Sequence, residues 1–449
     1  MAKAKFQKVS KSTILRIVSA TIIAMIIMSY KINSEAESIG RPASVLLPKD
    51  SLSVEDAIKE VIEHNDRAAA ASFMEKAAIE KIGPAGAWDD PMLMIGVQNL
   101  PTNFDFKMDP MTMRMIGIGQ NIPYAGQKGL QSEAAKADAL VSHEETRNTK
   151  IDLATAAKYA YFGLYYRQTT LNFIQEQHSL QEQVVSAAMA KLRTDQASQA
   201  DVAAAEADLW RLESDLLSSR QDIESAYNNL LALMGKEPGA RLPVLANPES
   251  MSIPESADIW YAQAKDNYPP LLKMKRQSQS YALSAAVARR MRWPMLSLSA
   301  IYGIRQSTEI EKRDNMVSFQ ANISLPIFEG RQQSNMAKSM EAMRRGTELE
   351  AGQMARDIQA DINTLHSKAQ RLVQSLRLYQ EQIIPADQDA FASALSGYSA
   401  NRMPFSNLLA YSSAIYRDRI TANQISYELA RTMAEAEKYF TNPDIWNEK

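Results

Sequence analysis

Methionine gathers in one short segment of this 449-residue chain. Of its 23 methionines, six lie in that segment: Met92, Met94, Met108, Met111, Met113 and Met115. Thioether sulfur is a soft ligand that suits Cu(I) and Ag(I), so the candidate metal ligands are Met92, Met94, Met113 and Met115. Methionine is also an adaptable apolar filler. We favour this second interpretation, because an apolar protein wall accounts for most of these residues without a metal.

Other residues that carry chemistry are absent or scattered. There is no cysteine, which excludes disulfides, thiolate metal sites and a lipidated N-terminal cysteine. None of the four histidines, His64, His143, His178 and His366, has a second ligand at metal-site spacing. The sequence has no phosphate-binding loop and no nucleophile motif, so we predict neither an enzyme nor a cofactor. A formal net charge of −2 predicts no basic surface for nucleic acid.

The N-terminus has the layout of a secretory signal peptide. Basic residues up to Arg16 precede an apolar run from Ile17 to Tyr30, and a small-x-small site follows at Ser34-Glu35-Ala36. We predict cleavage after Ala36, so that residues 1–36 are the signal peptide. An inner-membrane anchor is the alternative, although the run is shorter than the ~20 residues of a spanning helix. With no other long apolar stretch, we expect the mature protein to be periplasmic or to span a membrane through β-strands.

The sequence repeats itself at a fixed spacing. Pro294 lies 203 residues after Pro91, Pro326 lies 203 residues after Pro123, and the residues around each pair are similar. A repeat at constant period indicates two structural units with the same order of elements. We assign repeat 1 to residues 37–250, repeat 2 to residues 251–443 and a C-terminal tail to residues 444–449.

Each repeat contains two segments with the period-two alternation of β-strands. In the first repeat Ile116 and Ile118 lie on one face, and Met113 and Met115 lie on the opposite face. The predicted strands cover about 91–100 and 112–122 in repeat 1, and about 294–305 and 316–325 in repeat 2. A length of about ten residues suits a tilted transmembrane strand.

Proline and glycine mark the corners where predicted strands meet helices. A proline fixes φ and has no N–H donor, so it ends a strand ladder. The predicted membrane-corner residues are Pro91, Pro123, Gly126, Pro294, Pro326 and Gly330. Four strands per chain are too few for a membrane-spanning barrel, because the smallest known barrels have about eight. We therefore expect several chains to share one barrel.

A strongly helical sequence follows each strand pair. Between Leu130 and Met234 there is no proline and a single glycine, and strong helix formers dominate. The predicted helical hairpins cover about 127–234 and 330–440, and a helix that ends near Leu192 reaches roughly 100 Å. The apolar faces of these predicted helices are rich in alanine rather than in the large residues of a heptad repeat. This composition favours many closely packed helices over a coiled-coil rod.

These features together resemble the TolC-like outer-membrane factor (outer membrane efflux protein) family. The proline-to-glycine corners, the strand pairs beside very long helices and the duplication carry the resemblance over nearly all of the mature chain. It implies a mixed α/β membrane protein, a homotrimer whose 12-stranded outer-membrane β-barrel continues as a periplasmic α-helical barrel. The segments Asp89-Asp90-Pro91, Asn99-Leu100-Pro101 and Gln120-Asn121-Ile122-Pro123 are most similar to the heavy-metal efflux (CzcC/CusC-like) branch.

The resemblance implies an outer-membrane exit duct of a tripartite efflux system. Its implied partners are a periplasmic adaptor (membrane fusion) protein, an inner-membrane transporter of the resistance-nodulation-division (RND) type and outer-membrane lipid. The substrate would be heavy-metal cations, while a duct for drugs or for type I protein secretion stays an alternative. A periplasmic helical adaptor or scaffold is a second alternative, although we find no segment with the glycine-rich strand pattern of adaptor domains.

The resemblance also points to residues that would close the periplasmic end of such a duct. The segments around Tyr398 and Asp201 resemble the family's turn residues, so Tyr398 and Arg402 would donate hydrogen bonds to the Asp201 carboxylate. Asp195 and Asn407 are further gate candidates. The alternative is that these are ordinary solvated polar residues at helix turns.

Overall fold

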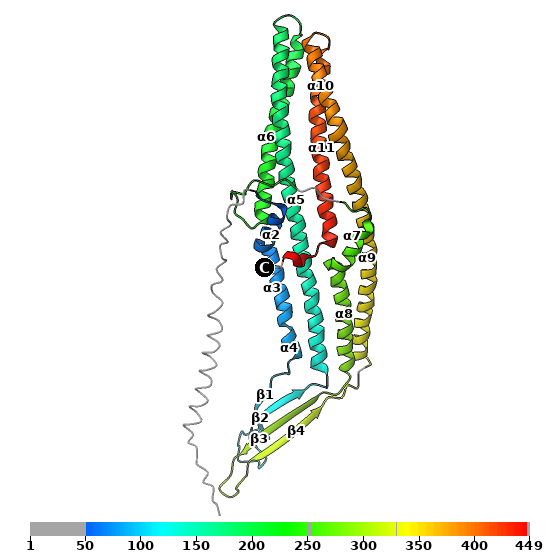
Figure 1. Ribbon diagram of the computed structural model, residues 1–449. Coiled ribbons are helices and arrows are strands. Elements are labelled where there is room, and N and C mark those ends of the chain that lie inside the picture. Colours follow the sequence, from blue (N-terminus) through cyan, green and yellow to red (C-terminus); the bar gives the residue numbers. More distant parts are fainter. Residues whose placement is uncertain (1–50, 249–252, 329, 447–449) are drawn as a thin grey trace, which may run out of the picture. The chain divides into compact units, whose positions relative to one another are not determined.

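The computed structural model describes residues 51–248, 253–328 and 330–446. The predicted signal peptide, residues 1–36, lies outside these ranges, as does the end of the predicted C-terminal tail. Helices dominate the described residues, together with one four-stranded sheet (Figure 1). In these ranges, no helix combines the length and the apolar character needed to cross a membrane.

The described elements follow the same order twice. The first series is α2 (Val54–His64), α3 (Asp66–Glu80), α4 (Ile82–Gly86), β1 (Met92–Gln98), β2 (Met113–Ile122), α5 (Gln127–Leu192) and α6 (Gln199–Leu233). The second series is α7 (Ala257–Asn267), α8 (Pro269–Arg290), β3 (Leu296–Arg305), β4 (Met316–Ile323), α9 (Gln333–Leu378), the π-helical turn η1 (Tyr379–Ile383), α10 (Ile384–Ser399) and α11 (Phe405–Phe440). A short 3₁₀ helix, η2 (Pro443–Trp446), follows. Each series therefore places short helices before two strands and a long helical hairpin after them.

The four strands form one antiparallel sheet in the order β1-β2-β3-β4. The register pairs Leu93 with Ile118, Ile118 with Ala300, and Ala300 with Phe319. Directly paired residues share a face, so this row belongs to one side of the sheet, which we call the apolar face. Its exposed members include Leu93, Ile95, Val97, Ile116, Ile118, Leu298, Tyr302, Ile304, Val317, Phe319 and Ile323. A sheet of a water-soluble protein would bury such a face against a core.

The opposite side of the sheet is the methionine–glycine face. It carries Met92, Met94, Gly96, Met113, Met115, Gly117, Gly119, Ser299, Gly303, Met316, Ser318 and Gln320. The sulfur of Met113 occupies the space that a Cβ at Gly303 would need, and the methyl group of Met94 lies near Gly119 at ordinary contact distance. Met111 lies in the turn before β2 and belongs to neither face. Methionine side chains thus fill the space above glycines on this face.

The predicted corner residues lie at the junctions of sheet and helices. Pro91 directly precedes β1 and Pro123 directly follows β2, while Pro294 and Pro326 lie two and three residues from their strands. Gly126 precedes α5 with a φ of 81°, a left-handed conformation that suits glycine. An arginine of α8, Arg290, donates a hydrogen bond to the Ala125 oxygen at 3.1 Å. This bond ties the corner of the first repeat to the second repeat.

Helix α5 is the centre of the helical part, because α3, α6, α8 and α11 all pack against it. Tyr161 of α5 lies in a cluster of buried apolar residues. Its hydroxyl donates to the backbone oxygens of Leu52 and Ala246 at 2.9 and 2.7 Å. The second long helix is interrupted, since η1 separates α9 from α10. Pro385 lies just after this turn and has no N–H to donate to the preceding turn, which accounts for the local widening. The predicted helical hairpin over about 330–440 did not include this break in its first helix.

Candidate functional site

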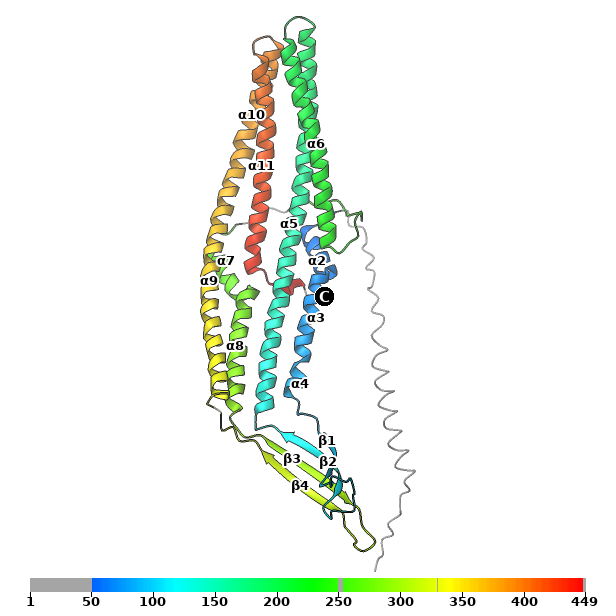
Figure 2. The same cartoon turned by 180° about the vertical axis from the view of Figure 1, so that it is seen from behind.

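The two helical hairpins turn at the same end of the molecule, opposite the sheet (Figures 1 and 2). The first turn lies between α5 and α6 and the second between α10 and α11. Asp195 in the first turn and Asn401 in the second have left-handed backbones, with φ of 54° and 58°. Aspartate and asparagine tolerate this conformation better than most residues. Their short polar side chains therefore let two long helices reverse direction in a few residues.

Lys191, at the end of α5, joins the two turns. Its ammonium donates hydrogen bonds to the Tyr398 backbone oxygen and to Oδ1 of Asn401. The same ammonium lies 4.1 Å from the centroid of the Tyr398 ring. Nδ2 of Asn401 in turn donates to Oε1 of Gln196 at 3.1 Å. Since Tyr398 lies in the last turn of α10, the cation also faces the negative end of that helix. We call Lys191, Gln196, Tyr398 and Asn401 the turn link.

The predicted gate residues lie in these turns or in the adjoining ends of α6, α10 and α11. The predicted hydrogen bonds to Asp201 are absent among the described residues of one chain. The Asp201 carboxylate accepts from the Ser198 backbone N–H at 3.0 Å, and Ser198 Oγ accepts from the Asp201 N–H at 3.2 Å. This capping box begins α6 and occupies the carboxylate. Among the described residues of one chain, neither Tyr398 nor Arg402 donates to Asp201, and their role in closing the periplasmic end stays a prediction.

The remaining gate candidates differ in their surroundings. Tyr398 is only 4% exposed, packs edge-on against Phe405 and has no hydrogen-bond partner for its hydroxyl among the described residues. Burial, with a smaller contribution from the Asp201 charge, raises the pKa of Tyr398. Arg402 and Asn407 are exposed, and Arg402 forms no ion pair in the described part of the chain. Tyr398 is therefore a packing residue of the turns, while Arg402 and Asn407 face solvent.

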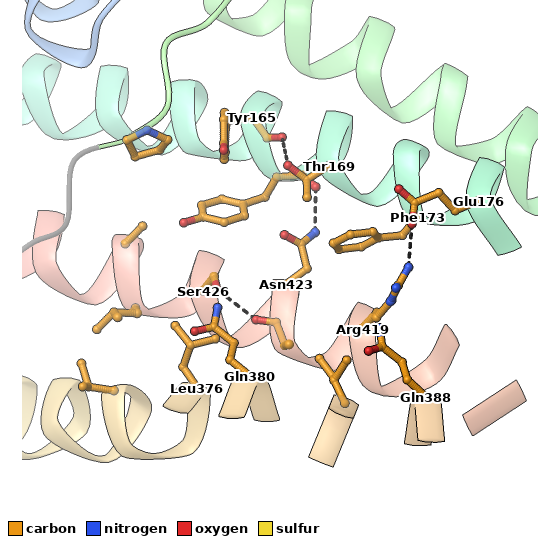
Figure 3. A pocket seen from close by; sticks show the side chains of 17 residues that line it. Tyr165, Thr169, Phe173, Glu176, Leu376, Gln380, Gln388, Arg419, Asn423 and Ser426 are labelled. Atoms are coloured by element: carbon orange, nitrogen blue, oxygen red, sulfur yellow. Dashed lines mark hydrogen bonds and ion pairs between the residues drawn. The ribbon is translucent and has the colours of Figure 1, made fainter. Parts of the chain in front are cut away.

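Further polar links join α11 to the first repeat between the turns and the sheet. Ser412 Oγ accepts from Gln177 at 2.9 Å, and the Tyr416 hydroxyl donates to Asp215 at 3.3 Å. Further along, Arg419 donates to Glu176 at 2.6 Å and Asn423 donates to Thr170 at 2.8 Å. Arg419 and Asn423 border a cavity of about 890 Å³ between α5, α11 and the η1 region (Figure 3). These links hold the two hairpins side by side along one stripe of α11.

The carboxyl groups of Asp387 in α10 and Asp418 in α11 lie close together. Burial and the neighbouring Asp418 carboxyl group raise the pKa of Asp387, while the Arg417 charge acts in the opposite direction. An aspartate with a raised pKa contributes stability that is present below its ordinary pKa and is lost as pH rises through the raised value. Asp387→Asn is therefore expected to raise the melting temperature at pH 7 and to change it little at pH 4. Because the pair is partly solvated, the gain stays below about 1 kcal/mol.

Thermal unfolding of the purified chain at pH 4 and pH 7 measures this effect. Asp389→Asn is the matched control, because Asp389 lies on the same helix and is exposed. An equal shift in both variants, or an Asp387→Asn shift that does not grow with pH, would contradict the prediction.

The described residues offer no cluster of three or more histidine, aspartate or glutamate side chains that would hold a metal ion. Among the predicted thioether ligands, Met113 is buried, Met94 and Met115 are half-buried and Met92 is exposed. Their placement above glycines accounts for Met94, Met113 and Met115 without a metal. The turn link is therefore a stronger candidate for a functional site than these methionines. The sequence showed Lys191 only as a basic residue near a helix end, with no sign of its partners.

Comparison with known proteins supports a specific family. A model described as outer membrane efflux protein matches residues 57–236. The curated outer membrane efflux protein BepC of Brucella suis biovar 1 (strain 1330) is 23% identical over 201 residues. That match covers 44% of this chain and 43% of BepC, so the chain spans less than half the length of this curated relative.

Solved structures are similar over most of the chain. CusC is 17% identical with a TM-score of 0.73, covering 87% of this chain and 92% of CusC. VceC of Vibrio cholerae is 14% identical with a TM-score of 0.71, covering 86% of this chain and 95% of VceC. The open state of the MtrE outer membrane channel of Neisseria gonorrhoeae is 14% identical with a TM-score of 0.71, covering 87% of this chain and 89% of MtrE. At such low identity, these similarities show the fold alone.

Proposed function

This chain belongs to the TolC-like outer membrane efflux protein family, and we propose that it is the passive exit duct of a tripartite efflux system. The family consists of channel proteins rather than enzymes. The chain is an outer-membrane protein whose helices extend into the periplasm. The substrate, the partners and the trimer are parts of the proposal.

The four-stranded sheet is the observation that carries the proposal. Within one chain, β1 and β4 are edge strands, and the apolar face is exposed. In lipid, each unpaired backbone group would cost several kcal/mol. Three chains, with β4 of one beside β1 of the next, give twelve strands and no edge. The apolar face then contacts lipid and the methionine–glycine face lines the lumen.

The helices supply the periplasmic part of the duct. α5 has 66 residues, which at about 1.5 Å per residue corresponds to roughly 100 Å. A duct of this kind has no means of coupling energy, so an adaptor and an inner-membrane pump of the RND type would supply it. The turn link lies at the end of the helices farthest from the sheet (Figure 1). That position suits contact with an adaptor and control of the aperture.

Conductance and mass test this proposal together. The purified full chain is expected to have the mass of three copies in detergent and to form conducting pores in planar lipid bilayers. A monomer that forms no pores would overturn it.

Heavy-metal cations are the substrate class that we propose. The resemblance of residues 89–91, 99–101 and 120–123 to the heavy-metal branch supports this choice, and drugs or secreted proteins are the alternatives. Deleting the gene in its host is expected to lower resistance to metal salts. A drop in drug resistance without a change in metal resistance would favour the drug alternative.

A further inference from the structure

A basic cavity of about 470 Å³ lies between the end of α8 and the first turns of α9. Four basic side chains line it, Arg289, Arg292, Lys338 and Arg345, together with the carboxylate Glu341. Small residues such as Ala337 and Ala342 form the rest of its wall and leave room between the charges. The cavity therefore combines space with a strong excess of positive charge.

The single carboxylate does not neutralise this charge. Arg344, outside the cavity, donates to Glu341 at 2.7 Å, and this hydrogen bond is the main reason that the pKa of Glu341 is lowered. Arg289 and Arg345 approach Glu341 only to 3.8 and 3.7 Å, beyond hydrogen-bond distance. Among the described residues, Lys338 forms no ion pair, and Arg292 donates only to a backbone oxygen of α8 at 3.3 Å. The cavity is thus ready to receive an anion.

The cavity lies next to the corners of the sheet. Arg292 is two residues before Pro294, so the Cα atoms of these two residues lie no more than about 7 Å apart. The headgroup layer of a bilayer has about this thickness on each side. Trp88 and Trp293 lie at the same corners with exposures of 60% and 64%, and Leu325, Ile327 and Phe328 are exposed beside β4. Exposed tryptophan is typical of membrane interfaces.

We propose that this cavity binds the phosphate of an anionic phospholipid headgroup in the periplasmic leaflet of the outer membrane. Guanidinium groups bind phosphate oxygens in pairs, and basic cavities at membrane surfaces are typical sites for anionic lipid. The inference rests on the proposed function, because lipid reaches the cavity only if the strands lie in the membrane. A lipid bound in this cavity would fix how deeply the junctions of strands and helices lie in the membrane.

Native mass spectrometry of the full chain in detergent tests the proposal, with phosphatidylglycerol and phosphatidylcholine as probes. Phosphatidylglycerol is expected to bind at least tenfold more tightly. Each basic side chain near a lipid surface contributes about fivefold to binding, so the double variant Arg292→Gln/Lys338→Gln is expected to bind phosphatidylglycerol about 30-fold more weakly. Salt at 0.5 M is expected to weaken binding to the unmodified chain as well.

The double variant Arg211→Gln/Arg377→Gln is the matched control, because both arginines are exposed on helices away from the corners. Equal lipid binding by the two double variants would overturn the proposal. Equal binding of both lipids, with inorganic phosphate as the better ligand, would overturn it in favour of a simple anion site. Pore formation is measured in the same samples, so that a failure of the duct proposal is recognised separately from a failure of the lipid site.

Discussion

Replacing Phe319 by arginine is expected to prevent the protein from assembling in the outer membrane. Phe319 lies in β4 on the apolar face and is 83% exposed in a single chain. In the proposed trimer its ring contacts lipid. An arginine on the lipid side of a membrane strand costs about 2–4 kcal/mol near the bilayer centre, and a trimer carries that cost three times. The measurement is the amount of trimer recovered from the outer-membrane fraction.

Gln320→Arg is the control for this prediction. Gln320 is the next residue of β4, at nearly the same depth, but belongs to the methionine–glycine face. An arginine there would face the lumen, so assembly is expected to stay close to that of the unmodified protein. If both variants assemble equally well, or only Gln320→Arg fails, the assignment of the two faces is wrong.

Replacing Lys191 by methionine is expected to raise the conductance of the reconstituted channel about fivefold or more. The methionine keeps most of the apolar stem but removes the ammonium that holds Tyr398 and Asn401. Hydrogen bonds to charged groups contribute about 1.5 kcal/mol each at the lower limit, and each of three chains loses them. The turns of the first and second hairpins would separate more readily, which favours an open periplasmic end. Single-channel recording in planar bilayers measures the change.

Two further variants serve as controls for the conductance experiment. Arg193→Met removes a positive charge from the same turn, and the exposed Arg193 side chain makes no ion pair among the described residues, so conductance is expected to stay unchanged. Tyr398→Phe removes only a buried hydroxyl that has no hydrogen-bond partner among the described residues, so this variant is also expected to conduct normally. If Tyr398→Phe raises conductance, the hydroxyl binds Asp201 in the trimer. If Lys191→Met conducts like the unmodified channel, the turn link has no role in gating.

The elements of this protein are largely predictable from local sequence. Alternation of Ile116 and Ile118 with Met113 and Met115 marks a strand, and β2 has those residues on opposite faces. The run without proline after Gly126 likewise corresponds to the unbroken α5. Such patterns are readable because side-chain direction and helix propensity depend on residues a few positions away. The π-helical turn before Pro385 was missed, since a proline predicts a disturbance without specifying how the helix absorbs it.

The two strand pairs and the long helices could be predicted from the sequence alone, together with a family resemblance that the comparisons confirm. Which polar residues meet became clear from the packed helices. Asp201 accepts a hydrogen bond from Ser198, three residues earlier, rather than from Tyr398. Lys191 donates to Asn401, which lies 210 residues later in the chain. The basic cavity likewise combines Arg292 with Lys338 from separate helices. The physical reason is that a hydrogen bond or an ion pair depends on how packed helices align, and no local pattern specifies that alignment.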